Sequence, residues 1–147
     1  MDKSEILSLA IEKETQAQQL YETAAYRMQD PAGKTLLAEL AVEEAKHRKM
    51  LEALPPDQAD EFHSDETQDR QIGEYLAPTP LSPGASLQDV LIYAIKREGE
   101  ARHFYETMAK SVDSADLQKL LRKLAAMETS HKARLEEFYE DVFLKEM

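Results

Sequence analysis

Apolar residues recur every three or four positions along four segments of the chain. This spacing places the apolar side chains of each segment on one face of an α-helix. It predicts an all-α protein with long helices over about 2–28, 31–54, 87–112 and 115–144. The stripe of the first helix contains Leu7, Ala10, Ala17, Tyr21 and Ala24.

Short polar residues mark where three of these helices begin. Asp30 before Pro31 is typical of an N-cap followed by proline in the first turn. Ser86, with Asp89 three residues later, resembles a second start signal, and either Asp113 or Ser114 supplies a third. Prolines 55 and 56 end the second helix.

The segment over about 55–85 differs in composition from the rest. It is rich in aspartate and proline, has weak periodicity, and leaves room for one short helical piece. Connections of about 30 residues are uncommon within one domain and need a structural reason.

An internal repeat explains the organisation of the chain. When Ala10 is aligned with Ala94, eight of sixteen positions of 10–25 are identical to 94–109, and at the same offset six of twelve positions of 36–47 are identical to 120–131. No gap is required. We therefore expect one domain over 1–147, made of a helical hairpin at about 2–54, a crossover at about 55–85 and a second hairpin at about 86–145.

Each hairpin places the same three ionisable residues within its apolar stripes. One glutamate lies in the first helix, and a Glu-x-x-His pair, whose members share one helix face, lies in the second. Core glutamates are rare unless they have partners. The six residues are Glu14, Glu44, His47, Glu98, Glu128 and His131.

Helix geometry predicts that these residues lie at matching heights. Glu14 and Glu44 are equally distant in sequence from the turn at Gln29, and Glu98 and Glu128 are equally distant from the turn at Asp113. If the hairpins associate about a pseudo-twofold axis, all six side chains meet. Four buried carboxylates would be balanced by two divalent cations, and one imidazole per cation gives a donor set that suits iron or manganese, with zinc possible. A helical bundle with Glu and His merely paired in its core is the alternative.

Several other residues have weaker claims on the site. Tyr21 and Tyr105 each occur two helical turns after a stripe glutamate and are either donors to a ligand carboxylate or plain core residues. A third Glu-x-x-His, Glu100 with His103, falls off the stripe and is expected at the surface, as is His63 in the crossover.

Composition excludes several classes of function. The chain has no cysteine, which excludes disulfides and iron–sulfur clusters and fits a reducing, cytoplasmic compartment. Its net charge of -11 argues against nucleic acid and against anionic membrane surfaces as partners. Neither a signal peptide nor a membrane-spanning segment is expected.

At the six stripe residues the chain resembles the rubrerythrin-like branch of the ferritin-like superfamily. The resemblance covers all four helices and implies a four-helix bundle with a di-iron site held by Glu14, Glu44, His47, Glu98, Glu128 and His131. It also explains the long crossover, because the second and third helices of that fold are parallel. Rubrerythrins proper add a cysteine-rich rubredoxin domain and a further glutamate where this chain has Ala101. Ala45 and Thr129 replace the methionine that binds haem in bacterioferritin, so no haem is expected.

Three hypotheses of function follow, of which the first two rest on the resemblance. The first is an oxidoreductase that reduces H2O2 or O2 with electrons from Fe(II) and an external donor. The second is a ferroxidase that feeds iron storage, and the third is a non-catalytic helical module with a structural metal or none. A homodimer is expected, because a long crossover permits exchange of hairpins between chains.

Overall fold

The computed structural model describes residues 3–54, 65–77 and 81–144. These residues form α-helices and one short π-helical segment, and no β-strand occurs among them. The all-α prediction is therefore confirmed. The chain divides into two compact units, Met1–Glu61 and Phe62–Met147.

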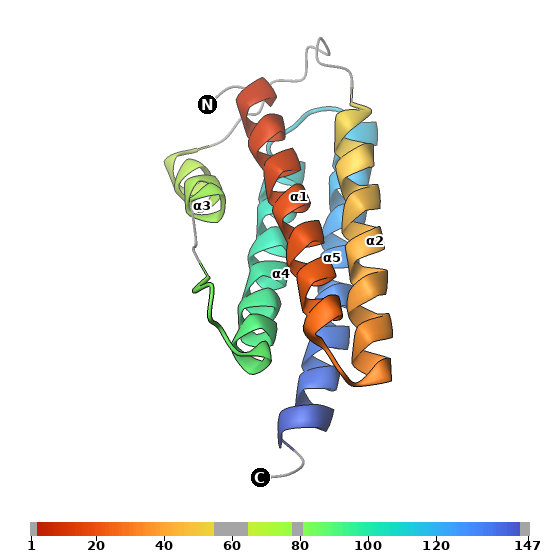
Figure 1. Ribbon diagram of the computed structural model, residues 1–147. Coiled ribbons are helices and arrows are strands. Elements are labelled where there is room, and N and C mark those ends of the chain that lie inside the picture. Colours follow the sequence, from red (N-terminus) through yellow and green to blue (C-terminus); the bar gives the residue numbers. More distant parts are fainter. Residues whose placement is uncertain (1–2, 55–64, 78–80, 145–147) are drawn as a thin grey trace. The chain divides into compact units, whose positions relative to one another are not determined.

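The first unit is a hairpin of α1 (Lys3–Arg27) and α2 (Pro31–Glu52). The two helices run antiparallel and pack along their length (Figure 1). Asp30 caps α2 as predicted, since its carboxylate accepts a hydrogen bond of 2.8 Å from the backbone N–H of Gly33. Lys34 donates to the carbonyl of Ala25 at 2.9 Å, which ties the start of α2 to the end of α1.

The predicted apolar stripe of the first hairpin is buried. Tyr21 and Ala24 of α1 and Leu37 and Leu40 of α2 are almost completely shielded from solvent. Complete burial of one leucine side chain contributes about 1.5–3 kcal/mol. The stripe is therefore what holds the two antiparallel helices in register.

The second unit repeats this hairpin with α4 (Leu87–Lys110) and α5 (Ala115–Tyr139). Ser86 caps α4 by accepting a hydrogen bond of 3.1 Å from the N–H of Asp89. Ser114, not Asp113, caps α5, because its hydroxyl accepts from the N–H of Leu117 at 3.2 Å.

The predicted end of the last helix was wrong in one respect. The α-helical pattern stops at Tyr139, and Glu140–Leu144 forms a π-helical segment, η1. None of its residues is buried. Little tertiary packing therefore holds the α-helical hydrogen-bond pattern in this last turn.

The short helical piece expected in the crossover is α3 (Glu66–Leu76). Asp65 and Gln68 form a capping box, in which each side chain accepts from the backbone N–H of the other. Tyr75 is buried and stacks on Phe104 of α4, with ring centroids 4.5 Å apart. The crossover therefore contributes a short helix that packs against part of α4 (Figure 1).

In the described part of the chain, every helix is too short or too polar to cross a membrane.

Candidate metal centre

Glu14, Glu44 and His47 come together in the first hairpin. Glu14 lies midway along α1, and the other two face it from α2, one helical turn apart. His47 Nδ1 is 3.9 Å from Glu14 Oε2 and 3.9 Å from Glu44 Oε2. All three residues are at most 1 % exposed. We call this set the first trio.

The second hairpin builds the same arrangement from Glu98, Glu128 and His131. His131 Nδ1 lies 3.6 Å from Glu98 Oε2 and 3.8 Å from Glu128 Oε1. Exposure is at most 3 % for each residue. This second trio reproduces the first with differences of a few tenths of an ångström.

The spacing of these atoms fits a shared cation better than direct pairing. A hydrogen bond between nitrogen and oxygen requires about 2.7–3.2 Å, and the imidazole–carboxylate distances exceed that range. Two donor atoms each about 2.1 Å from one ion lie between about 3.0 Å and about 4.2 Å apart, depending on the angle at the ion. In each trio, one donor atom from every residue lies within 4.8 Å of the others. The three side chains of each hairpin therefore converge on one small volume.

Charge balance points the same way. Two carboxylates in an interior of low dielectric are costly unless a cation or protons neutralise them. One divalent ion balances the two carboxylates of a trio, and the imidazole adds a neutral nitrogen. Mixed oxygen and nitrogen donors of this kind suit iron and manganese and are compatible with zinc.

Lys13 is a buried residue beside the first trio that the sequence patterns did not single out. It immediately precedes Glu14 and is 7 % exposed. Arg97 holds the equivalent position before Glu98, and it is half-buried. A cation before the stripe glutamate in both copies was visible in the repeat and would have drawn attention to the pair.

The other residues considered from sequence fall into two groups. Tyr21 and Tyr105 are buried, on α1 and α4 respectively, and their role as donors to ligand carboxylates stays a prediction. His103 is exposed and Glu100 half-buried, as expected of residues off the stripe. His63 lies outside the described residues.

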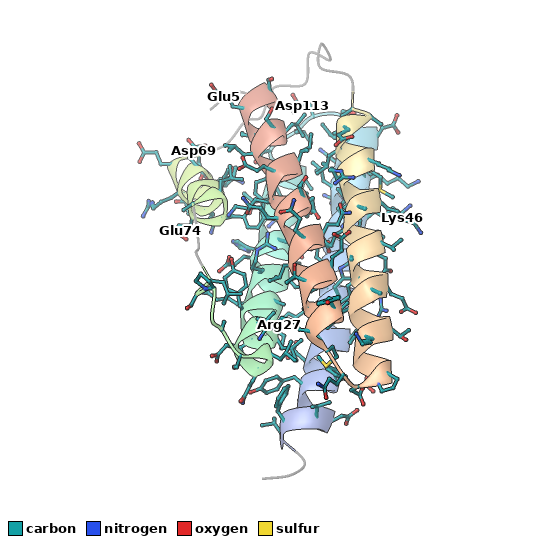
Figure 2. The ribbon with its side chains drawn as sticks, viewed as in Figure 1. Glu5, Arg27, Lys46, Asp69, Glu74 and Asp113 are labelled. Carbon is teal, nitrogen blue, oxygen red and sulfur yellow. The ribbon has the colours of Figure 1, made fainter. Side chains whose placement is uncertain are left out.

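The outer faces of the same helices are solvated. Lys46, which follows Glu44 by two positions, is exposed and points away from α1 (Figure 2). Successive residues of a helix are rotated by about 100°, so Glu44 and His47 can share the buried face while Lys46 lies outside it.

A family model described as rubrerythrin matches residues 5–80 and 89–147. A comparison with curated proteins gives no match.

Two solved structures resemble the chain. A hypothetical protein from Pyrococcus furiosus is 24% identical, with a TM-score of 0.69 over 93% of this chain and 87% of its own. A protein from Thermotoga maritima, provisionally assigned as a ferritin-like diiron-carboxylate protein, is also 24% identical, with a TM-score of 0.69 over 95% of both chains. These likenesses confirm the predicted ferritin-like fold.

Proposed function

This chain belongs to the rubrerythrin family, and on that premise we propose that it is a di-iron oxidoreductase that reduces H2O2 or O2. The observation that carries the proposal is the pair of buried trios. Each hairpin holds two carboxylates and one imidazole with donor atoms at the spacing of ligands around one ion.

We propose further that the two trios serve one dinuclear centre. The support comes from sequence register, because the two glutamates of each hairpin are equally distant in sequence from its turn, at Gln29 and Asp113 respectively. Hairpins that pair in the manner of di-iron carboxylate bundles would bring such residues to one height.

The protein residues have distinct tasks in this proposal. Glu14, Glu44, Glu98 and Glu128 hold the cations and balance their charge, while His47 and His131 supply one neutral nitrogen each. Bound ferrous ions would supply the two electrons that reduce peroxide to water. Leu40 and Leu124 lie one helical turn before Glu44 and Glu128 and are fully buried, so they would help to exclude bulk water from the cations.

Re-reduction requires a donor outside the chain. No cysteine is available to hold an iron–sulfur relay, so we propose an external electron donor and slow cycling without one. We also propose a homodimer, on the ground that the long crossover allows hairpins to be exchanged.

Metal content tests the ligand assignment. Protein produced with iron should hold about two metal ions per chain by elemental analysis. The double variant Glu44→Ala, Glu128→Ala should lose them, because one carboxylate disappears from each trio. His103→Ala is the matched control and should keep both ions, since His103 is exposed. Full occupancy in the double variant would contradict the assignment.

Single-turnover oxidation tests the reaction. Anaerobically reduced, iron-loaded protein should be oxidised by H2O2 at least as fast as by O2 in stopped-flow absorbance. Cycling should then be slow until a reductase is added. If peroxide leaves the reduced protein unchanged while O2 oxidises it and iron accumulates in large assemblies, a ferroxidase that feeds storage is the better account.

A further inference from the structure

A groove of about 790 Å³ lies within the second unit, between α3, α4 and α5. Small-molecule sites commonly have volumes of about 300–1,000 Å³. Its wall includes Tyr75 from α3, Ile92, Ile95 and Gly99 from α4, and Lys132 from α5. The groove is separate from the two trios, none of whose residues line it.

Gly99 lines this groove from the middle of the long helix α4. Glycine destabilises a helix interior relative to alanine, so such a residue needs a packing or functional reason. Packing does not supply one. A Cβ atom at Gly99 would meet its nearest neighbour, Lys132 Nζ, at 3.7 Å, which is an ordinary contact. The missing side chain instead leaves the side chain of Lys132 close to the backbone of α4, where it lines the groove.

The groove is lined by more basic than acidic residues, although the chain as a whole is acidic. The net charge of the chain is -11, yet the basic residues Lys96, Arg102 and Lys132 line the groove against Glu74 and Glu100. Charges more than about 8 Å away are largely screened at physiological salt. An anion in the groove would therefore be attracted by the basic groups that line it, and the acidic groups elsewhere on the chain would repel it only weakly.

These basic groups form weak ion pairs or none with other side chains. Lys96 lies 3.9 Å from Glu100, and Arg102 lies 3.6 Å from Glu106, both as partly exposed ion pairs. Such pairs contribute little and rearrange readily. Lys132 forms no ion pair or hydrogen bond within the described ranges. Its ammonium group is available to an incoming anion.

The first hairpin provides an internal comparison. At the position equivalent to Lys132, Arg48 donates a hydrogen bond of 2.7 Å to Gln18, and it lies 3.4 Å from Glu52. The position of Gln18 is taken by Arg102 in the second hairpin. A satisfied arginine–amide contact has thus been replaced by two cations that line one groove. Two cations that line one groove repel each other, and an anion bound in the groove would offset that repulsion.

We propose that this groove binds a small organic anion that carries an apolar or aromatic ring. The anionic group would lie between Arg102 and Lys132, beside Gly99. The ring would cover Ile92, which is 48 % exposed, and Ile95 beside it. This proposal does not rest on the proposed oxidoreductase activity, because no residue of either trio takes part.

The location gives such a ligand a short route to the second trio. Gly99 follows Glu98, and Lys132 follows His131, so the groove lies about 100° round each helix from a trio residue. A molecule bound there would rest on the same helices that present the second trio.

Two fluorescent probes that differ by one charged group test the proposal. The first is 8-anilinonaphthalene-1-sulfonate, an aromatic anion, and the second is N-phenyl-1-naphthylamine, which has the same rings without the sulfonate. The chain has no tryptophan, so probe emission can be followed without interference. We expect one sulfonate probe per chain, bound at least about tenfold more tightly than the neutral probe. The backbone amide signal of Gly99 should shift in nitrogen-15 NMR spectra as that site fills.

Variants locate the site and separate its two components. The double variant Arg102→Gln, Lys132→Gln should lower the affinity for the sulfonate probe by at least about tenfold. Its affinity for the neutral probe should change by less than about twofold. Gly99→Leu should lower the affinity for both probes, because the leucine side chain would fill part of the groove. Arg48→Gln, the equivalent change in the first hairpin, is the control and should leave both affinities unchanged.

Three results would contradict the proposal. Equal affinity of the two probes in the wild-type protein would exclude an anion site. Unchanged sulfonate binding in the Arg102, Lys132 double variant would place the probe elsewhere, as would an equal loss in Arg48→Gln. Circular dichroism and metal content of every variant show that an altered affinity does not come from loss of the fold.

Discussion

Replacement of Gly99 by alanine should make the protein more stable. The residue lies in the interior of α4, flanked by intact helical turns on both sides. The added methyl group would contact the side chain of Lys132, with Nζ at 3.7 Å and the nearest methylene carbons at 3.9 Å. No displacement of neighbouring atoms is required. The intrinsic helix preference of alanine therefore decides whether the free energy of unfolding rises or falls.

The magnitude follows from helix propensity. Alanine in a helix interior is favoured over glycine by about 0.8–1.0 kcal/mol, and ordinary contacts with the Lys132 stem oppose none of it. The free energy of unfolding should therefore rise by about 1 kcal/mol. For a chain of 147 residues, this corresponds to an increase in Tm of about 3 °C.

Urea unfolding followed by circular dichroism, together with a thermal scan, measures the change. The urea midpoint should rise while the slope of the transition stays constant, because the surface exposed on unfolding is nearly unchanged. Ala133→Gly, at an exposed position of α5, is the reverse control and should lower stability by a similar amount. An unchanged or lower Tm for Gly99→Ala would show that packing requires the glycine, and would remove the main structural reason for a ligand there.

Four further outcomes are expected. Leu121→Ala should cost about 2–5 kcal/mol in urea unfolding, because Leu121 is completely buried; a loss well below this range would contradict its place in the core. Ser114→Ala should cost about 1 kcal/mol by removing the cap of α5, and Ser114→Asp should restore it. Ferrous iron should raise Tm in a concentration-dependent way that a chelator reverses. Iron binding near neutral pH should release protons held by the buried carboxylates, so its calorimetric heat should depend on the ionisation enthalpy of the buffer. A heat that is independent of the buffer would contradict protonation of these carboxylates.

Helix starts were predictable from sequence, whereas one helix end was not. Asp30, Ser86 and Ser114 each cap a helix through a hydrogen bond to the backbone three positions on, an interaction that is local in the chain. The change from α- to π-helix after Tyr139 involves a segment with no buried residue. Its hydrogen-bond pattern is not specified by apolar periodicity.

The composition of both trios was predictable for a different reason. A glutamate or histidine within an apolar stripe contradicts the pattern around it, and the contradiction recurs at the equivalent positions of both copies of the repeat. The burial of Lys13 was not predictable, because a lysine is solvent-exposed unless tertiary packing covers it. Burial of its long side chain depends on neighbours that the local pattern does not reveal.

The groove could not be predicted, because it depends on contacts between elements far apart in sequence. Its α3 wall is positioned by the stacking of Tyr75 on Phe104, which the sequence does not reveal. One local signal was present, however. Gly99 lies in the centre of a strongly periodic helix, and the first copy has Thr15 at the equivalent position. A glycine there already indicated a special role for this position in the second copy.

Two hairpins whose donors align without a gap indicate an internal duplication of one hairpin. Before that event, a polypeptide of half the length would have carried one trio, and only a pair of identical polypeptides could have offered two. Any mutation in such a pair would have appeared in both members at once. In one chain this constraint is absent, so the two copies can differ, as Thr15 differs from Gly99 and Gln18 from Arg102. A duplicated chain can thus have a different surface on each hairpin while both hairpins keep the same two glutamates and one histidine.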